Sequence, residues 1–205
     1  MSYFKDLKNL IKLKKLQLRI KKYLTRVRSN ISPESAHSYA QVIFFNFKGG
    51  TTMGLTSQGI NAEKRISFAN TNFVYKGQRL KGDKEGFGVQ KWKDGALYMG
   101  QFKTNRANGL GIFKHSEGDE YKGEFYSDRA RGFGIYKHSN GATYEGFWVD
   151  DCQDGLGEEK WCDNSKFVGS YEKGKKQGLG TYTWADGSRY EGEWYANCLH
   201  GFVIY

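Results

Sequence analysis

The chain has little proline, few cysteines and no long apolar run. Of its 205 residues one is proline, Pro33, and three are cysteines, Cys152, Cys162 and Cys198. The cysteines form neither a C-x-x-C motif nor an even-numbered framework, which argues against a disulfide-built scaffold. No stretch approaches 18 apolar residues, so the sequence predicts no transmembrane helix. Because no signal peptide is evident, we expect reduced thiols and an intracellular protein.

An aromatic residue recurs every 23 residues over the last two-thirds of the chain. The recurring residues are Tyr75, Tyr98, Tyr121, Tyr144, Phe167 and Tyr190, and we number each repeat from this residue as position 0. A glycine follows at position 2 of every repeat. A period of this length is typical of stacked arrays, in which each unit buries its apolar face on its neighbours.

Within each repeat the residue types predict a β-hairpin and a connecting turn. Position 7 is Gly, Asn or Asp, and position 20 is Gly or Asn, which are turn residues. Positions 11 and 13 are paired glycines in the first five repeats, whereas the sixth has Gly201 and Val203 there. Position 4 is aromatic in all repeats except the first, where it is Arg79. Since side chains alternate along a strand, positions 0, 2 and 4 share an aromatic face. Positions 1 and 3 are mostly polar, so we expect the other face to be mostly wet.

The pattern Y-x-G-x-[WF]-x-x-[GND]-x-x-x-G-x-G resembles the MORN repeat (membrane occupation and recognition nexus) from Tyr75 to Tyr205. The resemblance implies an all-β fold, an elongated single sheet of hairpins. It also implies a scaffold or adaptor role, as in MORN proteins of cilia and flagella, parasite cytoskeletons and membrane junctions. The sequence departs from the pattern at Arg79, at Glu158-Glu159, where an apolar pair is usual, and at Tyr205, where the sixth unit stops after its second strand.

Two further segments precede this array of residues 75–205. Residues 31–74 form a bridge, in which a degenerate capping repeat would place Thr52, Gly54 and Gly59 at positions 0, 2 and 7. In the same count Ile66 matches Ile112 at position 14. A degenerate repeat is expected at this end, because arrays need atypical terminal units. Residues 1–30 form a basic arm.

The basic arm carries almost all of the net charge of the chain. Residues 1–30 contain the bases Lys5, Lys8, Lys12, Lys14, Lys15, Arg19, Lys21, Lys22, Arg26 and Arg28 and one acid, Asp6, which is +9 of the total +10. Residues 3–28 lack Gly and Pro, so we expect an α-helix. One apolar stripe comprises Leu13, Leu16, Ile20, Tyr23 and Val27, and a second comprises Phe4, Leu7, Leu10 and Ile11. The stripes point to nearly opposite sides, which favours a helix between partners over one lying on a bilayer.

Catalytic and metal-binding signatures are missing from the sequence. Gly49–Leu55 resembles a phosphate loop in composition but lacks the required Lys. His115 and His138 fall at position 17, where other repeats have Trp, so we interpret them as structural or surface residues. We therefore expect no enzyme activity, no cofactor, no metal and no small-molecule substrate, and no catalytic domain beyond the array.

These observations predict a non-enzymatic scaffold, a structural subunit of a large assembly such as a ciliary or axonemal one. Two alternatives are a peripheral tether to anionic membrane and, less favoured, an RNA-contacting subunit of an organellar complex. The setting would be cytoplasmic or cytoskeletal, with a mitochondrial location as the alternative. The predicted partner-binding residues are Leu13, Leu16, Ile20, Tyr23, Val27, Lys14, Lys15, Lys21 and Lys22 in the arm and Trp148, Tyr171, Trp184 and Trp194 in the array.

Overall fold

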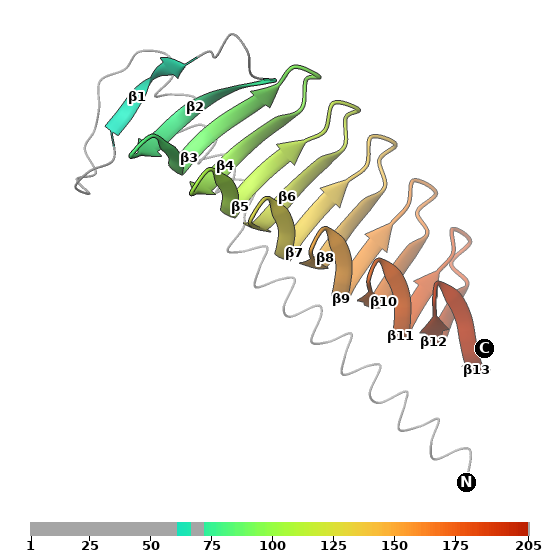
Figure 1. The fold of residues 1–205 in the computed structure, drawn as a ribbon. Helices are drawn as coiled ribbons and strands as arrows, with labels where there is room; N and C mark the ends of the chain where they lie inside the picture. Colours follow the sequence, from blue (N-terminus) through green and yellow to red (C-terminus); the bar gives the residue numbers. More distant parts are fainter. Residues whose placement is uncertain (1–60, 67–71, 205) are drawn as a thin grey trace.

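The computed structural model describes residues 61–66 and 72–204, with side chains over residues 72–201. This part of the chain forms one antiparallel sheet of 13 strands, in which strand order follows chain order (Figure 1). The strands are β1 Asn61–Ile66, β2 Phe73–Leu80, β3 Asp83–Trp92, β4 Leu97–Lys103, β5 Arg106–Lys114, β6 Glu120–Tyr126, β7 Arg129–Lys137, β8 Thr143–Val149, β9 Cys152–Lys160, β10 Lys166–Glu172, β11 Lys175–Thr183, β12 Arg189–Tyr195 and β13 Cys198–Ile204. The predicted all-β array is confirmed, whereas the basic arm lies outside the described residues.

Positions 6 and 7 form a two-residue turn in every hairpin. In the hairpin of β6 and β7, Ser127 has φ 50° and Asp128 has φ 70°. Positive φ at both central residues is the type I′ turn, whose twist matches that of the flanking strands. Asp128 also joins its hairpin to the preceding one, because its Oδ1 accepts a hydrogen bond from the Ala107 N–H at 2.7 Å. Asn105, Asp151 and Asn197 make the equivalent bond. Where position 7 is Asn or Asp, it therefore sets both the turn and the stacking of hairpins.

The turn predicted at position 20 connects consecutive hairpins. Between β5 and β6, the His115 N–H donates to the Asp119 carbonyl at 2.8 Å, and the Gly118 N–H donates to the His115 carbonyl at 3.1 Å. Gly118 has φ 99°. This is a three-residue loop ending in a left-handed residue, a common hairpin connection. The prediction of turns at positions 7 and 20 is thus confirmed.

Aromatic rings from positions 0 and 4 pack into a continuous column on one side of the sheet, which we call the ring face. These rings, the ring core, are Tyr75, Tyr98, Phe102, Tyr121, Phe125, Tyr144, Trp148, Phe167, Tyr171, Tyr190 and Trp194. Each position-4 ring lies between two position-0 rings. Phe125 makes T-shaped contacts with Tyr121 and Tyr98, each at 5.0 Å between centroids. Edge-to-face geometry of this kind stabilises each pair by about 1 kcal/mol beyond burial.

The paired glycines at positions 11 and 13 are required for different reasons. Gly132, at position 11, has φ +90°, a left-handed conformation at the point where the register of β6 and β7 shifts. Gly134, at position 13, has ordinary φ, but a Cβ there would lie 2.4 Å from the Tyr121 hydroxyl and 2.5 Å from its ring carbons. The first glycine permits a bulge, and the second makes room for the ring core.

Position 0 also carries a hydroxyl with a fixed role, which Phe167 lacks. The hydroxyls of Tyr75, Tyr98, Tyr121, Tyr144 and Tyr190 each donate to the carbonyl three residues on, at 2.8–3.0 Å.

We expect Phe167→Tyr to raise the free energy of unfolding by about 1 kcal/mol, because the new hydroxyl would reach the Ser170 carbonyl in the geometry of the other repeats. Urea unfolding of the two chains measures this difference. Tyr121→Phe is the matched control and should lower stability by a similar amount. A destabilised Phe167→Tyr chain would show that the fifth repeat differs from its neighbours around position 0.

The side of the sheet opposite the ring face is more apolar than the sequence predicted. Positions 1 and 3 are mostly polar, as expected, but positions 12 and 14 also lie on this side and are mostly apolar. Leu110 is 40% exposed there, and Ile112 and Ile135 are half-buried. The prediction of a mostly wet face is therefore wrong, because it was drawn from the first strand of each hairpin alone.

Strand β1 occupies the place that the second strand of an upstream repeat would take. It pairs antiparallel with β2, but in a slipped register. Between regular hairpins, position 14 lies opposite position 1, as in the pair Ile112 and Lys122. Ile66 instead lies opposite Tyr75, with a bulge before it. The capping unit therefore stays a prediction, and Thr52, Gly54 and Gly59 lie outside the described residues.

Candidate functional site

Three of the four predicted partner-binding rings of the array are buried. Trp148, Tyr171 and Trp194 are 8%, 4% and 7% exposed, because position 4 places each ring between two position-0 rings. The structure corrects the prediction for these three, since rings of the core are not available to a partner of the folded array. Trp184 differs, because it is 40% exposed. The predicted arm residues lie outside the described part of the chain.

A second set of rings on the ring face lies beside the core and is partly exposed. These rings come from positions 15 and 17, and we call them the aromatic band: Trp92, Phe113, His115, Tyr136, His138, Trp161, Tyr182 and Trp184. Position 15 lies opposite position 0, as in the pair Phe113 and Tyr121. The band therefore packs one side against the ring core and leaves the other side accessible.

Rings of the band contact one another in two runs along the array. The first run joins Trp92 to Phe113 at 5.6 Å between centroids and continues through His115 and Tyr136 to His138. The second run joins Trp161 to Tyr182 at 5.4 Å and Tyr182 to Trp184 at 4.9 Å. Contacts between neighbouring rings hold each ring in place, so the band is a preorganised surface.

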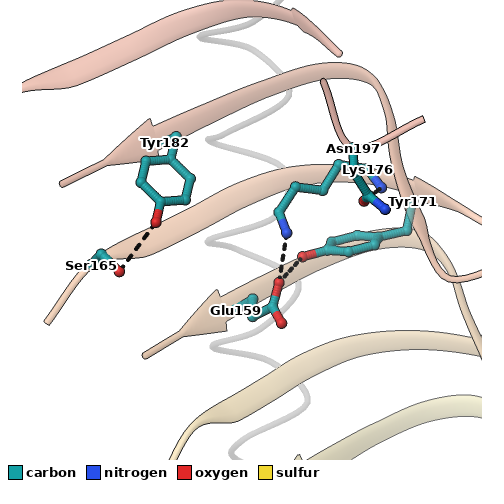
Figure 2. A network of polar contacts seen from close by, with 6 residues as sticks. All are labelled: Glu159, Ser165, Tyr171, Lys176, Tyr182 and Asn197. Carbon is teal, nitrogen blue, oxygen red and sulfur yellow. Dashed lines mark hydrogen bonds and ion pairs between the residues drawn. The ribbon is translucent and has the colours of Figure 1, made fainter. Parts of the chain in front are cut away.

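A half-buried ion pair separates the two runs, at position 15 of the fourth repeat. Figure 2 shows the Lys176 Nζ and the Tyr171 hydroxyl both donating to Glu159 Oε2, at 2.9 and 3.0 Å. The side chains of Lys176 and Glu159 are 14% and 18% exposed. Lys176 also lies over the Trp161 ring, 4.9 Å from its centroid. Glu159, which departs from the repeat pattern, is therefore paired rather than isolated.

Burial and the Glu159 carboxylate together raise the pKa of Tyr171 far above its usual value. Tyr171 therefore stays protonated and acts as a hydrogen-bond donor. Beside it the Tyr182 hydroxyl donates to Ser165 Oγ at 3.2 Å, which ties the second run to the connector that precedes β10 (Figure 2). The polar groups of this cluster satisfy one another, which is the requirement for burying them.

The first hairpin has a similar lysine at the same repeat position. The Lys84 Nζ donates to Gln90 Oε1 at 2.5 Å and lies 5.0 Å from the Phe102 ring centroid. Burial lowers the pKa of Lys84. Both lysines lie at position 9, which is Ala in the second and third repeats. Each lysine therefore takes the place of a small buried side chain, next to a residue at position 15 that is polar.

At the edge of the first run, Asp119 holds the connector turns together. The Tyr136 hydroxyl donates to Asp119 Oδ2 at 2.7 Å, the Ser139 N–H donates to Oδ1 at 2.8 Å, and His138 Nδ1 lies 3.3 Å from Oδ2. These contacts, the Tyr136 hydrogen bond foremost, lower the pKa of Asp119 to about 2.

A lowered pKa makes the contribution of Asp119 to stability depend on pH. A carboxylate whose pKa is lower in the folded state than in the unfolded state stabilises the protein at pH values above its unfolded pKa, near 4. This contribution is lost as pH falls through its folded pKa of about 2. We therefore expect Asp119→Asn to lower the urea midpoint at pH 6 and to have little effect at pH 2. An equal effect of Asp119→Asn at both pH values would contradict this assignment.

Residues 61–66 and 72–204 contain no group of three His, Cys, Asp or Glu side chains placed to hold a metal ion. Within the same residues no helix is long and apolar enough to cross a membrane. Cys152, Cys162 and Cys198 are free and exposed. The features of this part of the chain that remain as a candidate site are the aromatic band and the ion pair within it.

Comparison with known proteins agrees with the repeat seen in the structure. The MORN repeat model matches residues 75–97, 98–120, 121–143, 144–166 and 167–189. One similar solved structure is the SAS-4 (dCPAP) TCP domain of Drosophila melanogaster, in complex with a proline-rich motif of Ana2 (dSTIL). It is 14% identical, with a TM-score of 0.40, and the match covers 70% of this chain and 86% of that one. No curated protein matches the chain. The five matched repeats span more than half of the sequence, and the chain belongs to the MORN repeat family.

Proposed function

We propose that this chain is a non-enzymatic scaffold, a structural subunit that holds together proteins of a larger assembly. The aromatic band is its main partner-binding surface. The observation that carries this proposal is the arrangement of the band, whose rings pack against the ring core on one side and are accessible on the other. Stacked arrays present long surfaces of this kind to protein partners.

Aromatic side chains suit a protein interface for physical reasons. They bury large areas with few rotatable bonds, and they dominate binding hot spots. Ring contacts within the band restrict those bonds further, so little conformational entropy is lost when a partner binds.

The ion pair of Glu159 and Lys176 lies between the two runs of rings and would fix how a partner sits on the band. A partner with an apolar group at this point would leave the pair without solvent, whereas a polar group would complement it. Specificity would come from this point and affinity from the rings on either side.

Purification of the tagged full chain from its native source, followed by native mass spectrometry, tests the scaffold proposal. We expect the chain in a stable complex with other proteins, and a ciliary, flagellar or axonemal assembly is the first setting to examine. Recovery of the chain as a free monomer under gentle conditions would contradict the proposal.

The basic arm is the source of the alternative functions, because it holds +9 of the +10 net charge. Binding of the full chain to anionic liposomes and to RNA, measured over a range of salt, distinguishes them. If the arm acts through charge, binding should fall steeply with increasing salt. Replacement with Gln should then abolish this binding when it is made at Lys14, Lys15, Lys21 and Lys22. If the protein acts as a scaffold, this change should matter less than loss of the band.

We expect Trp184→Ala to weaken binding of the partner found in that complex by about 10-fold or more, since an exposed ring at the end of the band would lose its contact. Titration of the purified partner measures the change. Tyr195→Ala is the control, because Tyr195 is 61% exposed and points to the other side of the sheet. Equal loss of affinity in both variants would show that the band is not the binding surface.

A further inference from the structure

The side of the sheet opposite the ring face carries a second row of apolar side chains. From β3 to β11 it includes Val89, Met99, Leu110, Ile112, Ile135, Leu156, Val168 and Leu179. Phe87, Phe133 and Phe147 belong to the same row, and Phe133 and Phe147 lie opposite each other in the register. The proposed function does not use this row, because a partner on the aromatic band lies on the other face.

The shape of this row fits one α-helix. Along each strand the row is about two alternate residues wide, roughly 7 Å, which a helix of about 10 Å diameter covers. Across the strands it runs from β3 to β11. At about 4.8 Å between strands the row is about 38 Å long.

We propose that residues 3–28 of the same chain dock on this row as an α-helix. A helix of that length measures about 39 Å, which matches the length of the row. Its longer stripe, Leu13, Leu16, Ile20, Tyr23 and Val27, would face the sheet. The second stripe and most of the lysines would face outward, where an assembly contact would be made.

The position of β1 allows the arm to reach the row. β1 begins at Asn61 and pairs with β2 at the edge of the sheet. Residues 29–60 lie between the arm and β1, and an extended chain spans about 3.3 Å per residue. The tether is therefore far longer than the sheet is wide, and both faces are within its reach.

Charge on this side is balanced, so apolar contact would be the main source of affinity. Glu124, Glu145 and Glu158 lie among the apolar side chains, and Lys122 lies beside them. Lys122 and Lys114 pair with Glu120 at 2.6 and 3.2 Å. A basic arm would find acids for its flanking lysines but no strong net field.

Disulfide trapping in the full chain tests this docking. The three native cysteines, all exposed, are first replaced with Ser. Leu16→Cys is then combined with one array cysteine, at Met99, Ile112, Ile135 or Val168 on the proposed side, or at His115 or Trp184 on the ring face as a control. Because the tether reaches both faces, a difference in the rate of intramolecular disulfide formation reports docking.

We expect at least one cysteine of the proposed side to form the intramolecular disulfide about 10-fold faster than either ring-face control. Leu13→Ser with Ile20→Ser should abolish that preference, whereas Lys14→Gln with Lys15→Gln should keep it. Equal rates on the two faces, faster trapping on the ring face, or disulfides between molecules alone would overturn the proposal. Circular dichroism of each variant confirms that the array is folded before its rate is compared.

Discussion

Gly134→Val is expected to lower the free energy of unfolding by about 3 kcal/mol and the Tm by about 10 °C. The cause is steric, since a Cβ at Gly134 would lie 2.5 Å from two carbons of the Tyr121 ring. Tyr121 cannot move aside, because T-shaped contacts fix it against Phe125 and Trp148. Thermal unfolding followed by circular dichroism measures the change.

Two controls separate this collision from other effects of substitution. Lys122→Ala should change the Tm little, because the Lys122 side chain is 44% exposed on the opposite side of the sheet. Gly187→Ala places a Cβ in open space but keeps a φ of +86°, so it should cost about 1 kcal/mol from backbone strain alone. If Gly134→Val and Lys122→Ala melted at the same temperature, the close packing of rings on glycine would be wrong.

The second large effect is expected at the ion pair within the band. Lys176→Ala should lower the free energy of unfolding by about 2 kcal/mol, because Glu159 would keep its charge in a half-buried place without its cation. Glu159→Ala should have a similar effect. Urea unfolding of both single variants measures these losses.

The second and third repeats offer a variant that removes the pair without leaving a charge behind. Phe113, Phe125 and Ala130 occupy the places equivalent to Glu159, Tyr171 and Lys176. The triple variant Glu159→Phe, Tyr171→Phe, Lys176→Ala should therefore be at least as stable as the natural chain, although each polar deletion alone destabilises it. A triple variant less stable than Lys176→Ala would show that the fourth and fifth repeats cannot accept this packing.

The repeat spacing was sufficient to predict most of the fold. A period of 23 residues, with Asn, Asp or Gly at positions 7 and 20, predicted the hairpins and both turns. The spacing also predicted that glycines would face rings. Turn chemistry and close packing are local properties, so they can be read from residue types at fixed intervals.

The candidate site was predicted less well, because exposure depends on contacts between repeats. Trp148, Tyr171 and Trp194 are large aromatic residues like Trp184, and only the stacking of hairpins shows that the first three are buried. Phe113 and Tyr136 were overlooked because the alternation was applied to the first strand of each hairpin alone, whereas position 15 lies on the second strand. Extending the alternation along the second strand from the glycine at position 13, which lies on the ring face, would have found them.

The pairing of Glu159 with Lys176 was also out of reach from the sequence. The two residues are 17 positions apart, and they meet because β9, β10 and β11 are consecutive in the sheet. Glu159 was correctly recognised as a departure from the pattern. Its partner became visible when the register of these strands was known.

Hydroxyl-radical footprinting of the chain, free and within its native complex, tests most directly whether partners bind the aromatic band. In the complex we expect Trp161, Tyr182 and Trp184 to be oxidised several-fold more slowly than in the free chain, while Tyr126 and Tyr195, exposed elsewhere, keep their rates. Unchanged oxidation of the band, with protection at Tyr126 or Tyr195 instead, would contradict the account.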